Sequence, residues 1–238
     1  MRNMLAITGR ELSAIFFSSI AYWVAYHFLL VAGFFFVFTV LRPGQPAELG
    51  SLFLTVFLVL IAVCPAIGMR LISEELRSGT IEPLLTAPVS DASVIIGKWL
   101  ASWVFLVMLL APTVVFVAML EAWGEPDYGP ILAGYAGLVL CGGLFLAISI
   151  FTSTLSRDEI TAFNLALLIL EVLTIATYIL ARTLPANIAT VADYMNAREH
   201  YKDFTRGLVD AGDIVYFLSG IVLFLVLAIK TLESRKWR

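Results

Sequence analysis

Residues 131–155 read ILAGYAGLVLCGGLFLAISIFTSTL, a stretch without any acidic or basic side chain. A helix needs about 20 apolar residues to cross the hydrocarbon core of a bilayer, so this stretch is long enough to span a membrane. Small residues recur in it at every fourth position, namely Ala133, Gly137 and Cys141, and then Gly143 and Ala147. Such stripes let helix backbones approach closely. We therefore expect them to serve helix packing, and a pore-lining role is the alternative.

Five further apolar runs flank this stretch, at residues 14–41, 52–69, 94–120, 160–181 and 214–229. The whole chain is 61% hydrophobic and 14% charged, whereas soluble domains carry about 45–50% apolar and about 25% charged residues. This composition excludes a soluble enzyme domain. The sequence predicts an all-α polytopic membrane protein with six transmembrane helices in a single domain, residues 1–238. Pro112 lies inside the third run, where a kink is expected.

The N-terminal residues precede the first apolar run. Leu5, Ile7 and Leu12 alternate there with polar side chains, which predicts a short interfacial helix. The run at 14–41 is longer than the apolar region of a signal peptide, which has about 7–15 residues. We therefore interpret it as an uncleaved first span.

The basic residues are divided unequally between the two sides of the predicted bundle. With a cytoplasmic N-terminus, ten of the 15 lysines and arginines fall in inner segments and the other five in outer ones. Cytoplasmic loops carry the excess of basic residues. We therefore expect a multi-pass membrane protein with both termini in the cytoplasm.

Several kinds of chemistry are absent from the sequence. A phosphate-binding loop needs Ser or Thr after its Gly-Lys pair, but Trp99 follows Gly97-Lys98. Neither His27 nor His200 has a Cys or acidic neighbour at metal-ligand spacing. The two cysteines, Cys64 and Cys141, lie in apolar runs and are expected to be packing residues. With a net charge of −3, the chain has no basic excess for nucleic acid. The sequence thus predicts neither catalysis nor a cofactor.

The inner segment at residues 70–93 is too long and too apolar for a passive hairpin. Ser73 is placed to cap a short helix whose first turn carries Glu74 and Glu75. Gly79 is expected to end that helix, and Pro88 to end the segment. A short helix on the membrane surface with apolar and charged side chains is suited to docking in a groove of a soluble partner. A solvated loop is the alternative.

The same segment carries a family resemblance. Residues 74–90, EELRSGTIEPLLTAPVS, resemble the cytoplasmic loop of ABC-2-type transporter permeases, most closely the branch of the gliding-motility and nitrous-oxide-reductase-maturation permeases. The segments at 204–210, 213–219 and 232–237 are similar to that branch's C-terminal region. Pro83 departs from the pattern, where many relatives have a helix-favouring residue.

The resemblance implies a membrane subunit that pairs with a second permease copy or a paralogue and with two cytoplasmic ABC ATPase subunits. An auxiliary envelope protein is a further implied partner, besides membrane lipid. The loop would then be the coupling segment that seats in the ATPase, through Glu74, Glu75, Arg77, Thr80, Ile81, Glu82, Leu84 and Leu85. We hypothesise that Glu74 and Glu75 meet basic residues of the ATPase, and that Leu84 and Leu85 fill its apolar groove.

Glu171 lies near the middle of the fifth run, with Thr174 and Asn164 at helical spacing. A carboxylate there costs about 2.5–3.5 kcal/mol on insertion scales, and such residues mark transport paths, subunit contacts or proton sites. A hydrogen-bonded packing role is the equal alternative.

The outer segment, 182–213, contains Ile188, Val191, Ala192 and Met195 at helical spacing. We expect a short amphipathic helix that rests on the outer leaflet or caps the exit. A simple connecting loop is the alternative.

Two other classes of function remain open. A stand-alone secondary carrier or channel should show an internal repeat or several intramembrane charges, and only Glu171 and His27 qualify here. A membrane anchor whose ATPase drives a motility or maturation machine, without substrate translocation, is compatible with the same motifs.

Overall fold

The computed structural model describes residues 2–41, 48–80 and 89–235, and no strand occurs within these ranges. Six helices in them are long and apolar enough to cross a membrane, which confirms the predicted all-α, six-span fold. The candidate spans are Ser19–Val40, Gly50–Ser78, Asp91–Ala122, Tyr128–Leu155, Glu159–Thr183 and Ala211–Arg235.

The first half of the chain forms three of the spans. Helix α1 (Arg2–Phe16) precedes the first span, which consists of α2 (Ser19–Phe35) and a π-helical turn, η1 (Phe36–Val40). The second comprises α3 (Gly50–Gly68) and α4 (Arg70–Ser78). The third comprises α6 (Asp91–Leu110), the 3₁₀ turn η2 (Ala111–Thr113) and α7 (Val114–Trp123).

The second half begins with the longest helix. Helix α8 (Tyr128–Leu155) forms the fourth span, and α9 (Glu159–Glu171), the π-helical turn η3 (Val172–Ala176) and α10 (Thr177–Thr183) form the fifth. Two short helices follow, α11 (Ala186–Met195) and α12 (Ala197–Thr205). Helix α13 (Ala211–Arg235) is the last span.

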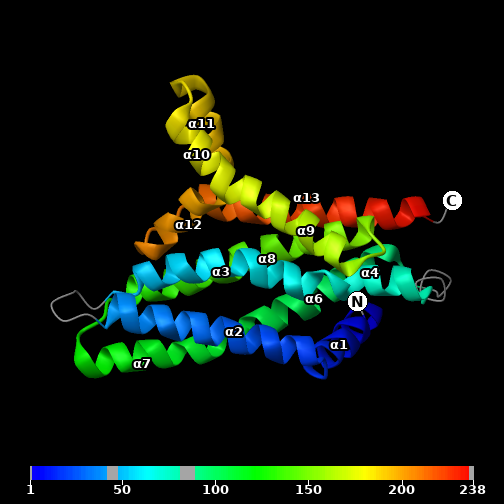
Figure 1. Ribbon diagram of the computed structural model, residues 1–238, viewed down its shortest axis with the longest axis horizontal. Coiled ribbons are helices and arrows are strands. Elements are labelled where there is room, and N and C mark those ends of the chain that lie inside the picture. Colours follow the sequence, from blue (N-terminus) through cyan, green and yellow to red (C-terminus); the bar gives the residue numbers. More distant parts are fainter. Residues whose placement is uncertain (1, 42–47, 81–88, 236–238) are drawn as a thin grey trace.

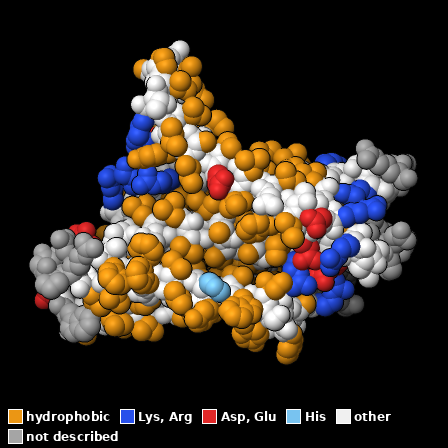
Figure 2. Space-filling model, viewed as in Figure 1, with side chains coloured by type: hydrophobic (Ala, Val, Ile, Leu, Met, Phe, Trp, Pro, Cys, Tyr) orange, Lys and Arg blue, Asp and Glu red, His pale blue; other side chains and the backbone are white. Residues whose placement is uncertain are grey.

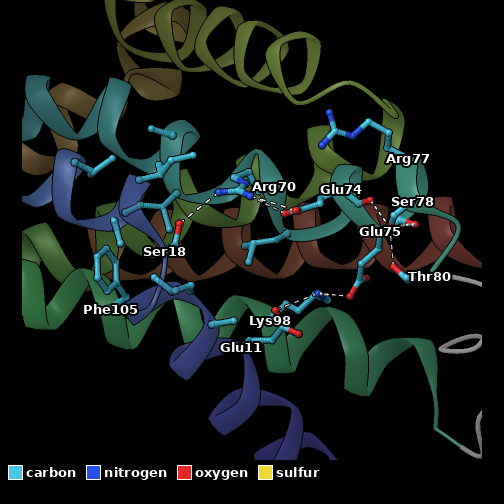
Figure 3. Close-up of a pocket in the computed structure, with 18 residues that line it drawn as sticks. Glu11, Ser18, Arg70, Glu74, Glu75, Arg77, Ser78, Thr80, Lys98 and Phe105 are labelled. Carbon is cyan, nitrogen blue, oxygen red and sulfur yellow. Dashed lines mark hydrogen bonds and ion pairs between the residues drawn. The ribbon is translucent and has the colours of Figure 1, made fainter.

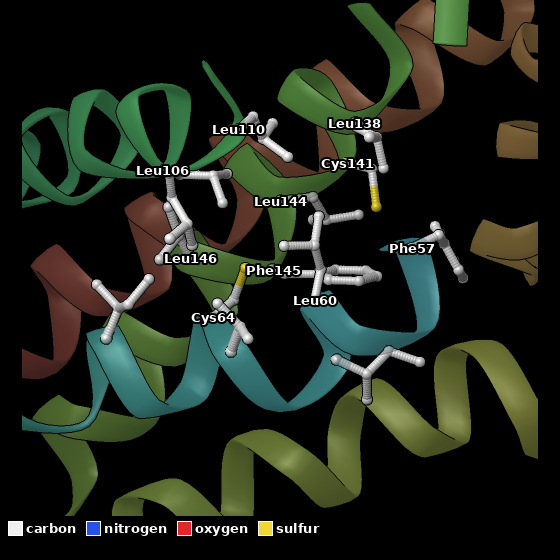
Figure 4. Close-up of a cluster of buried hydrophobic side chains, with 14 of the residues drawn as sticks. Phe57, Leu60, Cys64, Leu106, Leu110, Leu138, Cys141, Leu144, Phe145 and Leu146 are labelled. Carbon is white, nitrogen blue, oxygen red and sulfur yellow. The ribbon is translucent and has the colours of Figure 1, made fainter. Parts of the chain in front are cut away.

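Helix α8 occupies the centre of the bundle and packs against α3, α6, α9, α12 and α13 (Figure 1). Its small residues allow this: a Cβ added to Gly142 would lie 2.2 Å from Leu106, and one added to Gly137 would lie 2.8 Å from Phe204. The predicted packing role of the small residues is thus confirmed. Cys64 and Cys141 are buried and free, and lie in the same apolar core as Phe57, Leu60 and Phe145 (Figure 4).

Some predicted boundaries are wrong. The first span begins at Ser19, not at residue 14, because α1 continues to Phe16 and a break follows. The N-terminal helix exists as expected but packs on α6, where the Thr8 hydroxyl donates to the Gly97 carbonyl at 3.1 Å. The second span does not stop at its predicted end at residue 69 but continues as the helix α4, whose Leu71, Ile72 and Leu76 are buried against the bundle. At Pro112, where a kink was expected, the 3₁₀ turn η2 interrupts the helix between α6 and α7.

Helices α10 and α11 form a hairpin that projects from the bundle (Figure 1), and the amphipathic helix expected in the outer segment corresponds to α11. Ile188, Val191 and Met195 are exposed on it. A hydrophobic surface covers much of this face of the molecule, as a membrane protein requires (Figure 2). Helix α12 instead returns to the core, where Tyr201 is fully buried and stacks on Phe57 with ring centroids 5.0 Å apart.

Candidate functional site

Helix α4 follows α3 and forms the first part of the inner segment at residues 70–93, which the sequence predicted to dock on a soluble partner. The predicted N-terminus of this helix at Ser73 is wrong: Ser73 is buried inside α4, and its hydroxyl donates to the Met69 carbonyl one turn earlier. The apolar residues of the span continue into α4, so the chain needs no new helix start. The predicted end is confirmed, because Gly79 follows α4 with a φ of 75°, the left-handed conformation that glycine favours there.

Ser153 of α8 secures the junction between α3 and α4. Its Oγ accepts hydrogen bonds from the backbone N–H of Ile72 at 3.0 Å and of Ser73 at 2.9 Å. The same hydroxyl donates to the Met69 carbonyl at 2.9 Å. One buried side chain therefore satisfies three backbone groups at the junction, which ties the base of α4 to the central helix.

Glu159, at the start of α9, bridges two arginines of α4. Its carboxylate lies 3.4 Å from Arg70 Nε and 3.0 Å from Arg77 Nη2. Asp158 caps α9, and hydrogen bonds from the Thr161 hydroxyl and backbone N–H hold the pKa of Asp158 below its ordinary value. Because that cap fixes the first turn of α9, the Glu159 bridge (Arg70, Arg77, Glu159) joins α4 to the fifth span.

The opposite side of α4 is joined to α6 and α1. Lys98 of α6 has a side chain only 2% exposed, and its Nζ lies 2.9 Å from Glu75 and 3.3 Å from Glu11. Arg10 lies 2.7 Å from Glu11 and 4.0 Å from Glu75. We call these four residues the Lys98 cluster. A buried ammonium requires such partners, and together they connect three helices.

A cavity of about 490 Å³ lies between these helices, and Figure 3 shows its lining. Arg70, Glu74 and Lys98 contribute to its polar side, and Ile15 and Phe105 to its apolar side. Arg70 Nη1 donates to the Ser18 hydroxyl at 3.3 Å and Nη2 to Glu74 at 3.2 Å. Among the residues that the structure describes, no group of three or more His, Cys, Asp or Glu side chains could hold a metal ion. Ion pairs and hydrogen bonds therefore join α4 to α1, α2, α6 and α9 around this cavity.

The predicted coupling residues differ in their surroundings. Glu74 and Arg77 are substantially exposed, with side chains 46% and 62% accessible. Thr80 is exposed as well, and its hydroxyl is hydrogen-bonded to that of Ser78 at 2.8 Å. Glu75, by contrast, is directed to Lys98 within the chain. The remaining predicted residues, Ile81, Glu82, Leu84 and Leu85, lie outside the described ranges.

Sequence reasoning overlooked Lys98, Glu159 and Ser153 as parts of this site. The sequence could have indicated a role for Lys98, since an ammonium inside an otherwise apolar run requires a partner. The partners themselves, Glu11 and Glu75, are distant in sequence, so only the fold brings them together. Ser153 had no signal, because serine is common in packed transmembrane helices.

Glu171 is exposed on the outer surface of α9, and no described residue makes an ion pair or side-chain hydrogen bond with it. Asn164 is exposed two turns away on the same helix, but Thr174 is buried and its hydroxyl donates to the Leu170 carbonyl. The prediction that Thr174 shares a polar helix face with Glu171 is therefore wrong, because Thr174 lies in the π-helical turn η3 and faces the core. Asn196 donates to the Thr174 carbonyl at 3.2 Å and stabilises that turn.

Six long apolar helices, the second of which continues into the polar helix α4, define a multi-pass membrane protein. Residues 31–235 match the family described as ABC-2 family transporter protein, which covers most of the chain, so this chain belongs to that family. It is accordingly a permease component of an ABC transporter, and the family implies partnership with ABC ATPase subunits. No curated protein is significantly similar to it in sequence.

Proposed function

We propose that this chain converts the movement of a separate cytoplasmic ABC ATPase into movement of its transmembrane helices, in an exporter of the bacterial inner membrane. The described chain begins and ends at the end of the bundle that carries α4 (Figure 1). Together with the ten-to-five division of basic residues, this supports a cytoplasmic position of α4 and of both termini. Residues 70–93 would then meet the ATPase.

The observation that carries the proposal is the double connection of α4. The Glu159 bridge links α4 to the fifth span, while the Lys98 cluster links it to the third span and to α1. A push on the segment after Gly79 would therefore reach several helices at once. In this proposal Glu74 and Thr80 face the ATPase with Ile81, Glu82, Leu84 and Leu85. Arg77 is 62% exposed and reaches the ATPase from the Glu159 bridge, whereas Glu75 acts inside the permease, where it is paired with Lys98.

Co-purification of the ATPase tests this assignment. We expect the combined substitutions Glu74→Lys, Thr80→Glu and Leu85→Asp, which leave the Glu159 bridge intact, to reduce the amount of ATPase bound to the tagged permease by at least about tenfold, since they remove charge and apolar complementarity. The measurement is the ATPase-to-permease ratio after gentle solubilisation.

A matched control places similar changes at the opposite end of the bundle. Arg206→Glu with Leu208→Asp alters two exposed residues there and should leave the ratio unchanged. An unchanged ratio in the triple variant, with a normal elution profile, would refute the assignment.

A second copy of the chain, or a paralogue, is the proposed membrane partner. Glu171 supports this, because an exposed carboxylate near the middle of a span is costly against lipid alone. Either a facing subunit or a transport path between subunits would relieve that cost.

Glu171→Gln keeps the shape of the side chain and removes its charge. If Glu171 lies on a transport path or at a subunit contact, we expect transport, or ATPase stimulation by the permease, to fall by about tenfold or more. The measurement is ATPase activity of the assembled complex in lipid. Asn164→Ala, on the same exposed face, is the control for mere surface changes, and wild-type activity of Glu171→Gln would leave only a packing role.

We also infer that the chain belongs to the branch of gliding-motility and nitrous-oxide-reductase-maturation permeases, on the likeness of residues 74–90, 204–210, 213–219 and 232–237. In that branch the complex could drive an envelope machine with an auxiliary protein instead of moving a substrate. Genes for envelope or motility proteins next to an ATPase gene would favour this second function.

A further inference from the structure

Two ionisable side chains, His27 of α2 and Glu171 of α9, are exposed within spans of the bundle. Figure 2 shows one histidine over α2 and one isolated acidic side chain over α9, on the same face and at similar positions along the bundle. The side chains around them are mainly hydrophobic. Polar groups of this kind are costly against lipid, so both require a partner.

The chain itself satisfies only one nitrogen of His27. Its Nδ1 lies 2.8 Å from the Trp23 carbonyl oxygen one turn earlier, so Nδ1–H donates to that oxygen. Trp23 and Tyr26 lie beside the imidazole, with ring centroids 5.7 Å and 5.3 Å from it. No described residue forms a hydrogen bond with His27 Nε2. The partner of Nε2 must therefore come from outside the described chain.

The face that carries both groups consists of α2, α3 and α9. Helix α3 packs against α2 and against α9, and lies between them in Figure 1. The second span, which contains α3, is 61% buried, whereas the first and the fifth spans are each only 22% buried. The two outer helices of this face therefore leave the largest surface uncovered, and each of them carries one of the two groups.

Symmetry determines which helices would meet if a second copy covered this face. Both copies have the same orientation in the membrane, so a two-fold axis that relates them runs along the membrane normal. Rotation about this axis keeps the depth of every residue and reverses the order of the three helices. With the axis opposite α3, helix α2 meets the partner's α9, and α9 meets the partner's α2. Groups at similar depths on α2 and α9 then face each other twice.

The chemistry of the two groups favours this position of the axis over its alternatives. An axis next to α9 would bring two Glu171 carboxyl groups together, and an axis next to α2 would leave Glu171 in lipid. In the mixed arrangement the Glu171 carboxyl group donates to Nε2, or an imidazolium donates to the carboxylate. One shared proton satisfies both groups in either form.

We propose that the face formed by α2, α3 and α9 is the interface between two copies of this chain, in which His27 contacts Glu171 of the partner subunit. This inference rests on the proposed pairing with a second copy, and it identifies the face and the residues that make the contact. It does not depend on how the ATPase binds.

Disulfide formation between two differently tagged, co-expressed copies tests the contact. One copy carries His27→Cys and the other Glu171→Cys. We expect at least about tenfold more cross-linked dimer than when both copies carry His27→Cys or both carry Glu171→Cys, because a disulfide requires Cα atoms within about 7 Å. The native thiols of Cys64 and Cys141 are buried and do not compete.

Asn164→Cys is the matched control for position along α9. Asn164 is exposed on the same helix, about 10 Å from Glu171 along the axis. Paired with His27→Cys, it should give little cross-linked dimer. As much dimer with Asn164→Cys as with Glu171→Cys, or as much from like pairs as from the mixed pair, would overturn the proposed contact.

Co-purification of the two tagged wild-type copies separates this inference from the proposed pairing. If the copies co-purify but the mixed cysteine pair gives no excess dimer, the pairing stands and this interface is wrong. If they do not co-purify, the pairing with a second copy fails as well.

A further variant tests the energetic role of the pair. His27→Leu leaves Glu171 without its partner and should reduce the co-purified fraction by about tenfold. Adding Glu171→Leu should restore it, because the polar group that lost its partner is then absent. An unchanged fraction in His27→Leu would contradict the contact.

Discussion

Lys98→Met is expected to lower the free energy of unfolding by about 2–4 kcal/mol. The substitution keeps the length of the side chain but leaves the carboxylates of Glu11 and Glu75 without their central partner, and both are mostly buried. Removing one member of a buried ion cluster is costly because the remaining charges stay desolvated. Thermal unfolding of the detergent-solubilised chain measures the loss.

The control for this experiment is Lys230→Met. Lys230 is 70% exposed and pairs with Glu233 at 2.7 Å, and exposed ion pairs contribute little. Adding Glu75→Gln to Lys98→Met should restore part of the stability by removing an unpaired charge. Equal stability of Lys98→Met and the wild type would show that the Lys98 cluster does not hold α4, α6 and α1 together.

Gly68→Ala is expected to destabilise the bundle by about 3 kcal/mol, the upper range for overpacking. A Cβ at Gly68 would lie 2.4 Å from the Cβ of Ser149 in α8, and that atom cannot move without its backbone. Helices α3 and α8 must therefore separate next to the junction that Ser153 secures. We expect weaker coupling to the ATPase together with a lower unfolding temperature.

Gly9→Ala, in contrast, is expected to raise the stability of the chain slightly. A Cβ at Gly9 would meet nothing within 4 Å, and replacing glycine by alanine inside a helix stabilises it by up to about 1 kcal/mol.

Ser149→Gly should partly rescue Gly68→Ala, because it removes the opposing Cβ. The double-mutant cycle therefore measures the contact itself. Additive effects of the two substitutions would contradict the close approach of α3 and α8.

The hydropathy of the chain was sufficient for the six spans, because a bilayer requires about 20 apolar residues per helix whatever the neighbours are. Two further features, the 3₁₀ interruption at Pro112 and the helix end at Gly79, could also be predicted locally, since each depends on a single residue's backbone chemistry. The helix start at Ser73 could not be predicted correctly, because burial of Leu71, Ile72 and Leu76 against the bundle outweighs a local capping preference.

The roles of the charged residues depended on packing in three dimensions. Glu74 and Glu75 are adjacent and chemically identical, yet one is half exposed and the other is paired with Lys98. Glu159 meets Arg77, and His200 meets Asp213, across loops that no local pattern relates. Amino-acid composition and hydropathy therefore specify which segments enter the membrane. Which charges face one another follows only from helix packing, because an ion pair depends on the distance between atoms and not on their separation along the chain.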